Sequence, residues 1–173
     1  MGMLSRYYYW WLGISGLLGF FLGAVLKVAW EESKFIIGEW DDDPIVVVCP
    51  DSQLTNYRVH HAVDWWGIRG YETAYVHFDR DNQICSKGRW SRGIIFIRAT
   101  GELLPNTYAI TSRLTILNKM MSAEIILPNE HRYERRLLEH ELGHAFGMRH
   151  VEKEGHIMHP LLEFGGEIFY IPD

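Results

Sequence analysis

The chain has 173 residues, of which 47% are apolar and 23% are charged, and its formal net charge is −5. This composition is that of a globular protein of one modest domain, or of a smaller domain with an appendage, and the negative charge argues against nucleic-acid binding. Two cysteines, Cys49 and Cys85, are too few for a disulfide scaffold. They form either one disulfide, in an oxidising compartment, or two free thiols.

The N-terminal segment is strongly apolar. Residues 7–26 (YYYWWLGISGLLGFFLGAVL) contain no charge, aromatic residues crowd their start, and Trp30 follows their end. About 20 residues of helix span a bilayer core of roughly 30 Å, and aromatic rings favour its two interfaces. We therefore predict a transmembrane anchor over residues 1–30. A cleaved signal peptide is the alternative, but it usually has a more basic start than the single Arg6.

Small residues recur every fourth position of this segment, at Ser15, Gly19 and Gly23. This spacing lets two membrane helices approach closely, so it indicates a face for self-association, although glycine is also common in such helices. Residues 31–44 (EESKFIIGEWDDDP) are predicted to be an acidic linker. Its adjacent aspartates lack the alternating spacing of a calcium loop.

From residue 45 to residue 173 we expect one compact domain. Short β-branched runs predict strands, over residues 45–49, 73–78, 93–99, 107–117 and 122–128. Apolar residues at helical spacing predict two helices, over residues 57–70 and 129–147. The first ends at Gly70, and the second begins at an Asn129 N-cap and ends at Gly147. Strands followed by a long helix indicate a single α+β layered structure.

The last helix carries the sequence HELGHAFGMRH. His140 and His144 are four residues apart and so project from one face of the helix. Glu141 can reach a water on a metal held there without binding the metal itself. Gly147 allows the backbone to leave the helix sharply, through a positive φ. Three residues later, His150 can return as a third ligand. Three protein ligands leave a position for water, which is typical of catalytic rather than structural zinc.

A methionine, Met158, follows His150 by eight residues in HIMHP. The segment LLEHELGHAFGMRHVEKEGHIMHP resembles the metzincin clan of zinc peptidases, whose long histidine motif precedes a methionine turn. The spacing is most like that of the matrixins. The resemblance implies a zincin-like α+β fold with a mixed twisted sheet, an active-site helix and a Met-turn. It implies one zinc ion whose ligands are His140, His144 and His150. It also implies that Glu141 is the general base and that Met158 is the turn methionine.

The segment YAITSRLTILNKMMSAEIIL looks like the strand pair that precedes the active-site helix in small matrixin-like proteins. In the clan, a strand along the cleft pairs with an extended substrate. The resemblance therefore implies substrate-binding residues, which are Tyr108, Ala109, Ile110 and Thr111. His159 departs from the tyrosine that matrixins usually carry after the turn methionine, but it is close to the proposed site and is a further candidate for substrate contact. His156 is also expected close to the site.

A calcium site of the matrixin kind is a further expectation of the resemblance. Asp79 and Asp81 in HFDRDNQ are its candidates, but their spacing is incomplete and a polar turn is preferred.

The leading functional hypothesis is a membrane-anchored zinc endopeptidase in which Glu141 is the general base. One alternative is a zinc-stabilised binding module without catalysis, which the intact Glu141 disfavours. Another is a zinc amidase that acts on cell-wall peptides, because the same activated water attacks any amide. By resemblance to a mostly secreted clan, and given the cysteine pair, we expect a single-pass membrane protein whose domain lies outside the cytosol.

Overall fold

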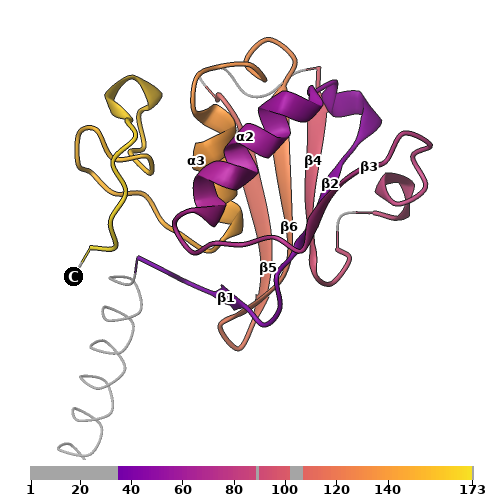
Figure 1. Cartoon of the computed structure of the whole chain (residues 1–173), viewed down its shortest axis with the longest axis horizontal. Coiled ribbons are helices and arrows are strands. Elements are labelled where there is room, and N and C mark those ends of the chain that lie inside the picture. The colour runs from indigo at the N-terminus through magenta and orange to yellow at the C-terminus, as the bar shows by residue number, and fades with distance from the viewer. Residues whose placement is uncertain (1–34, 89, 102–106, 173) are drawn as a thin grey trace, which may run out of the picture. The chain divides into compact units, whose positions relative to one another are not determined.

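The computed structural model describes residues 35–88, 90–101 and 107–172 (Figure 1). The predicted transmembrane anchor, with its small residues Ser15, Gly19 and Gly23, lies outside these ranges. Within them, no helix has the length and apolar character needed to cross a membrane.

The described residues contain one mixed sheet with the strand order β1-β6-β4-β2-β3, to which β5 adds by pairing with β6. Only the β5–β6 pair is antiparallel. The strands are β1 (Glu39–Trp40), β2 (Ile45–Val48), β3 (Tyr75–Phe78), β4 (Ile94–Thr100), β5 (Ile110–Ile116) and β6 (Lys119–Pro128). All five predicted strands are present, whereas the two-residue β1 was not predicted.

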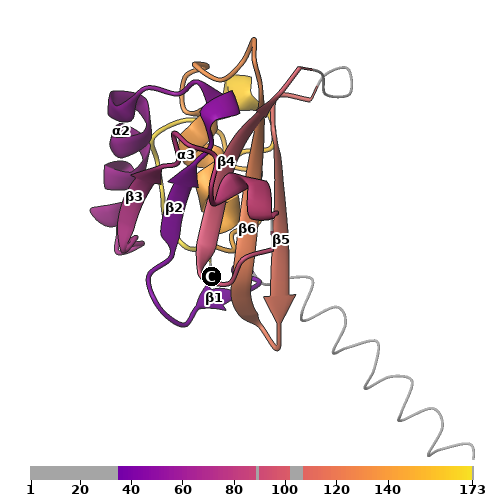
Figure 2. The same cartoon turned by 90° about the vertical axis from the view of Figure 1, so that its right-hand side faces the viewer.

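Two helices, α2 (Asn56–Gly67) and α3 (Leu137–Ala145), cover one face of this sheet (Figures 1 and 2). Alternate residues of the strands face them because strand side chains alternate in direction. These buried side chains include Val46, Val48, Ile95, Ile97, Ile125 and Leu127. Trp66 of α2 is fully buried, and its indole N–H donates to the Glu139 carbonyl at 2.7 Å, so it joins the two helices.

The opposite face of the sheet carries a smaller apolar cluster. Val47 and Phe96 point to this side, beneath the segment that follows β3. A Cys49–Cys85 disulfide, with Cα atoms 5.8 Å apart, ties this segment to the end of β2. Of the two alternatives that the sequence left open, the structure therefore has the disulfide.

The Asp79 carboxylate organises the segment after β3. Asp79 accepts backbone N–H groups of Gln83, Ile84 and Cys85 at 3.0, 2.8 and 2.7 Å. Burial raises the pKa of Asp79, but these hydrogen bonds outweigh it and the pKa ends below its ordinary value. Among the described residues, the only cluster suited to a metal lies elsewhere. The structure shows a polar turn at Asp79, and the calcium site stays an expectation.

The predicted start of the second helix at Asn129 is wrong, because α3 begins at Leu137. Residues 129–136 form turns instead, and Arg136 has a φ of 65°. Their sequence, NEHRYERR, has one large apolar side chain, Tyr133, which is 53% exposed. Without an apolar face to pack, a helical stretch of this length is not stable.

Residues 35–44, the described part of the predicted linker, pack onto the domain. Ile37 donates its backbone N–H to the Gly147 carbonyl at 2.9 Å, and Arg149 donates to the Phe35 carbonyl at 2.8 Å. The strand β1 then pairs with β6. This segment therefore braces the loop that leaves α3.

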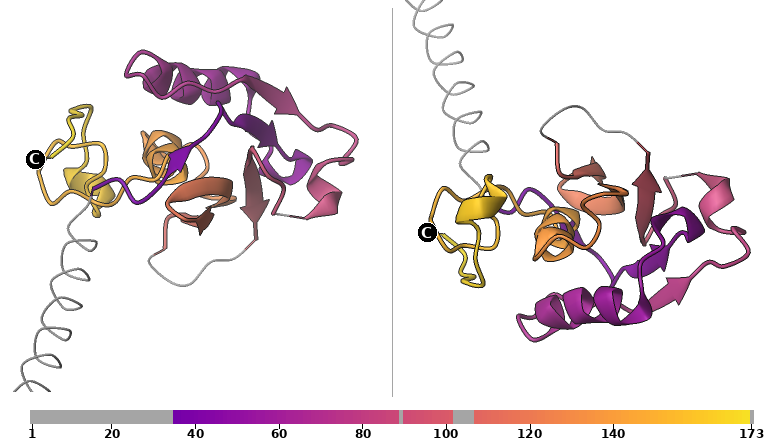
Figure 3. Two further views of the ribbon diagram at one scale, coloured as in Figure 1. Left: turned by 90° about the horizontal axis from the view of Figure 1, so that it is seen from below. Right: turned by 90° about the horizontal axis from the view of Figure 1, so that it is seen from above.

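The chain after α3 forms loops and short turns, and Figure 3 shows it beside α3, on the side away from β4. No α-helix closes the described C-terminal part. The 3₁₀ turns among the described residues are η1 (Pro50–Ser52), η2 (Cys85–Lys87) and η3 (Leu162–Phe164).

Candidate active site

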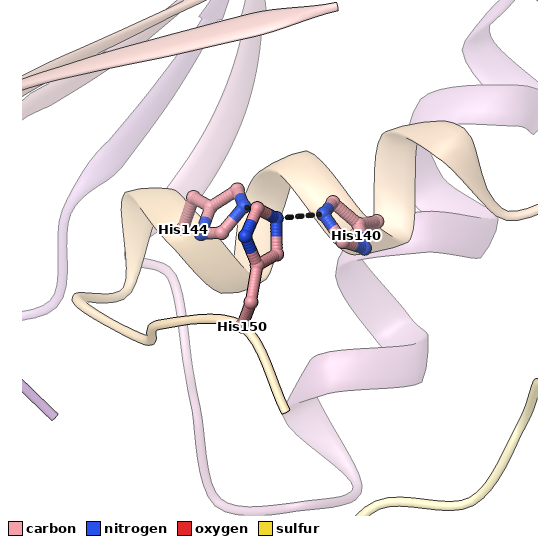
Figure 4. Close-up of side chains that lie close together, drawn as sticks. All are labelled: His140, His144 and His150. Atoms are coloured by element: carbon pink, nitrogen blue, oxygen red, sulfur yellow. Dashed lines mark hydrogen bonds between the residues drawn. The ribbon is translucent and has the colours of Figure 1, made fainter. Parts of the chain in front are cut away.

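Three histidines converge beside α3 (Figure 4). His140 and His144 stand one turn apart on the helix, and His150 comes from the loop that follows it. The Nε2 atom of His150 lies 3.3 Å from that of His140 and 3.1 Å from that of His144. The structure thus brings together the three side chains that the sequence analysis proposed as ligands.

Two glycines make this arrangement sterically feasible. Gly147 has a φ of 95°, and a Cβ there would lie 2.1 Å from the Gly38 carbonyl oxygen. A Cβ on Gly143 would lie 2.3 Å from the Met158 sulfur. Met158 is fully buried against α3 behind the histidines. It is therefore a support of the helix and not a ligand.

The ligand histidines are oriented by backbone carbonyls. Nδ1 of His140 lies 2.8 Å from the Ile157 oxygen, and Nδ1 of His144 lies 2.9 Å from the Met148 oxygen. A carbonyl only accepts, so each Nδ1 carries the proton and each Nε2 presents a lone pair to the centre. Such carbonyl partners are typical of zinc-bound histidines.

The residues present fit a zinc ion. Bonds of about 2.0–2.1 Å to zinc in tetrahedral geometry place ligand nitrogens roughly 3.3 Å apart, close to the two observed separations. Burial lowers the pKa of His140 to about 4 and of His144 to about 3, and also lowers that of His150. All three rings are therefore neutral at pH 7, as metal ligation requires.

Glu141 is buried next to this cluster, with 5% of its surface exposed. Its carboxylate accepts a hydrogen bond of 2.5 Å from the Thr111 hydroxyl. Burial raises the pKa of Glu141 to about 7, against the opposing effects of this hydrogen bond and of the Arg113 charge. A carboxylate with a pKa near neutrality is suited to both accept and return a proton.

A cleft of about 710 Å³ runs over the histidines. It is lined by all five residues that the sequence analysis named for substrate, which are Tyr108, Ala109, Ile110, Thr111 and His159. Among the described residues, β5 pairs only with β6, so its other edge is open along the cleft. The role of the five lining residues in substrate binding stays a prediction.

His156 does not line the cleft. It is fully buried, accepts the backbone N–H of Met158 at its Nδ1, and lies with Nε2 3.1 Å from the Tyr170 oxygen. Its position near the motif in sequence therefore reflects a structural role in the Met-turn, which the residue order alone did not indicate.

Sequence reasoning also missed Arg113, which lines the cleft from β5. The signal was available, because Arg113 lies two residues after Thr111 and so on the same face of the strand. No comparable signal pointed to Arg58, which contacts α3 from a position 81 residues earlier.

Comparison with protein families places these features in context. The family model for matrixin matches residues 59–170. Comparison with curated protein sequences gave no match. Since the matched range spans more than half of the chain and includes the histidine cluster, Glu141 and the cleft strand, the chain belongs to the matrixin family, which supports zinc metalloendopeptidase activity in general.

Proposed function

We propose that this chain is an endopeptidase that uses one zinc ion, held by His140, His144 and His150. The observation that carries the proposal is a single juxtaposition. Three imidazole nitrogens lie within 4.8 Å of one another, beside a buried carboxylate and under the open edge of a strand. A structural zinc site has no use for that carboxylate or for that strand edge.

Zinc, when bound, supplies a Lewis acid that polarises a carbonyl and lowers the pKa of water. Glu141 takes a proton from the attacking water and delivers it to the leaving amine. Thr111 holds one carboxylate oxygen of Glu141, while the other has no hydrogen-bond partner among the described residues. That second oxygen is therefore the one that receives the proton.

The open edge of β5 binds the substrate. An extended peptide adds to such an edge through backbone hydrogen bonds, which are independent of its side chains. Tyr108 and Ile110 are exposed residues that line the cleft, and the carboxylate of Glu141 contacts the next residue, Thr111. A peptide paired there passes over the histidines.

The test is cleavage of a peptide library by the purified full-length protein, with added zinc and with a chelator. We expect internal cuts that the chelator abolishes and that Glu141→Gln lacks. If only cell-wall peptides were cleaved, the amidase hypothesis would replace the endopeptidase hypothesis. Zinc binding without any cleavage, in both proteins, would favour a binding module.

We also propose that the domain lies outside the cytosol and is anchored through residues 7–26. The Cys49–Cys85 disulfide supports the compartment, because disulfides persist in oxidising surroundings. Protease added to intact cells should degrade the domain. Protection of the domain until the membrane is opened would contradict this orientation.

A further inference from the structure

Two arginines line the cleft, and the proposed hydrolytic chemistry uses neither. Arg113 comes from β5, and Arg149 comes from the loop after α3. Glu141 is the only carboxylate among the described residues that line the cleft. Among the described residues that line the cleft, two arginines thus stand beside a single carboxylate, although the chain as a whole has a net charge of −5.

Arg113 is held in place through one of its nitrogens. Its Nη1 donates to the carbonyl oxygens of His144 and Met148, at 3.1 and 3.0 Å. The His144 carbonyl belongs to the last turn of α3, and Met148 lies in the loop just after it, where the helix dipole favours a cation. Among the described residues, Nε and Nη2 have no hydrogen-bond partner, and no carboxylate lies within ion-pairing distance. Capping the helix thus leaves the rest of the guanidinium facing the cleft.

The surroundings of Arg113 favour an anion. Burial and the like charge of Arg149 lower the pKa of Arg113, while the Glu141 carboxylate raises it. The guanidinium nevertheless stays charged, because arginine is not deprotonated in proteins. A partly buried cation is stabilised by an anionic ligand, which offsets its lost hydration.

The strand register places this charge relative to the chemistry. Thr111 contacts Glu141, and Arg113 lies two residues further along the same face of β5, roughly 7 Å away at about 3.4 Å per residue. A peptide paired with the open edge has the same rise. The side chain that meets Arg113 is therefore about two residues from the one beside Glu141, toward the His144 end of the cleft.

We propose that Arg113 is a specificity residue, which binds a carboxylate of the substrate about two residues from the scissile bond. The proposal rests on the proposed peptidase function. The carboxylate has two chemical sources, which are an aspartate or glutamate side chain within the peptide and the free C-terminus of a short peptide. Both offer two oxygens to the guanidinium, and arginine is well suited to bind such a group.

The experiment uses one fluorogenic peptide that the full-length zinc-loaded protein cleaves. Aspartate or asparagine is placed at each of the three positions on either side of the cut, with the C-terminus free or amidated. We expect kcat/KM at one position to be at least tenfold higher for aspartate than for asparagine. A preference that appears only with a free C-terminus assigns the anion to the terminus. Equal rates for aspartate and asparagine at every position, with either terminus, would overturn the proposal.

Variants separate specificity from structural support. Arg113→Gln should abolish the aspartate preference, whereas a residue that only caps α3 would slow all peptides by the same factor. Arg113→Lys keeps the charge and should retain part of the preference. The matched control is Arg92→Gln, which removes an arginine that is 74% exposed and near Asp41, and should leave the preference intact. An unchanged preference in Arg113→Gln would refute the assignment.

Binding provides a readout that does not depend on turnover. The zinc-loaded Glu141→Gln protein should bind the aspartate peptide more tightly than the asparagine peptide, by fluorescence anisotropy, and added salt should reduce the difference. This binding measurement does not need the Arg113→Gln protein, so it tests the proposal even if that variant fails to fold. If no peptide is cleaved but the binding difference is present, the peptidase proposal fails and the carboxylate site stands. If the binding difference is absent, the carboxylate site fails.

Discussion

The two faces of α3 carry two buried glutamates whose pKa values are shifted in opposite directions. Glu139 faces α2, where Arg58 binds it with two hydrogen bonds of 2.7 Å and His61 lies at 3.2 Å. Glu141 faces the cleft, where Thr111 is its hydrogen-bond partner. The exposed fractions are 3% and 5%, so burial alone does not distinguish them.

The partners decide the charge of each carboxyl group. Burial raises the pKa of Glu139, but the hydrogen bonds and charge of Arg58 outweigh it and the pKa ends below its ordinary value. Burial raises the pKa of Glu141 to about 7, because a hydroxyl offsets little of the lost hydration. One helix thus has a carboxylate that is ionised at neutral pH and joins two helices, and a second one poised for proton transfer.

The sharpest way to test this difference is to remove the charge of Glu141. Glu141→Gln keeps the shape of the side chain but cannot take a proton. Peptidase activity should fall by about 10²–10⁴-fold, the usual contribution of a general base. Zinc content and thermal stability should change little, since the histidines hold the metal. Wild-type activity in this variant would remove Glu141 from the chemistry.

On the other face, Arg58→Met should act on stability and not on chemistry. It leaves the Glu139 carboxylate buried without its main partner, so the free energy of unfolding should drop by about 3–5 kcal/mol. Urea denaturation measures this. The double variant Arg58→Met/Glu139→Leu should recover much of the loss, because no buried charge remains. A loss in the double variant as large as in the single one would contradict this account of the pair.

Removal of a zinc ligand should affect only the face of α3 that borders the cleft. His150→Ala should weaken zinc binding by more than the roughly 10–100-fold typical of outer partners of a metal site. Chelator competition measures the affinity. Glu139→Gln serves as the control and should bind zinc as the wild type does. Full zinc affinity in His150→Ala would exclude His150 from the ligand set.

The stabilising effect of Glu139 should depend on pH in a defined direction. Its folded-state pKa is lowered, so its contribution is complete above the unfolded value of about 4.3 and is lost as pH falls through the folded value. The difference in unfolding free energy between wild type and Glu139→Gln should therefore be constant near neutrality and shrink in acid. A difference that grows as pH falls would mean that the carboxylate is not ionised in the fold.

The smallest effect is expected at Thr111. Thr111→Val removes the hydrogen bond that lowers the pKa of Glu141, so the acid limb of kcat/KM should move to higher pH. The rate at neutral pH should fall by about tenfold or less, in line with the net value of one hydrogen bond. The control is Thr115→Val, at the far end of β5. An acid limb that does not move would show that Thr111 leaves the base unaffected.

Local patterns predicted most of the fold and the centre of the site. Alternation and β-branched runs identified five strands, and the interval between His140 and His144 placed both on one helical face. The start of α3 was missed, because Asn129 looks like an N-cap and only packing shows that residues 129–136 have nothing to bury. The hairpin turn falls at Leu117–Asn118, which have positive φ values, so β6 starts earlier than expected.

The sequence by itself determined the chemistry of the site, because the spacing of three histidines and one glutamate within eleven residues is a property of the local chain. Only the tertiary structure decided how those groups are tuned. The Ile157 carbonyl orients His140, Arg58 stabilises the ionised form of Glu139, and Gly38, within residues 35–44, packs on Gly147. These partners lie 17, 81 and more than a hundred residues away in the chain. Burial and hydrogen bonding between such distant segments set protonation states and ligand geometry, and no local pattern encodes them.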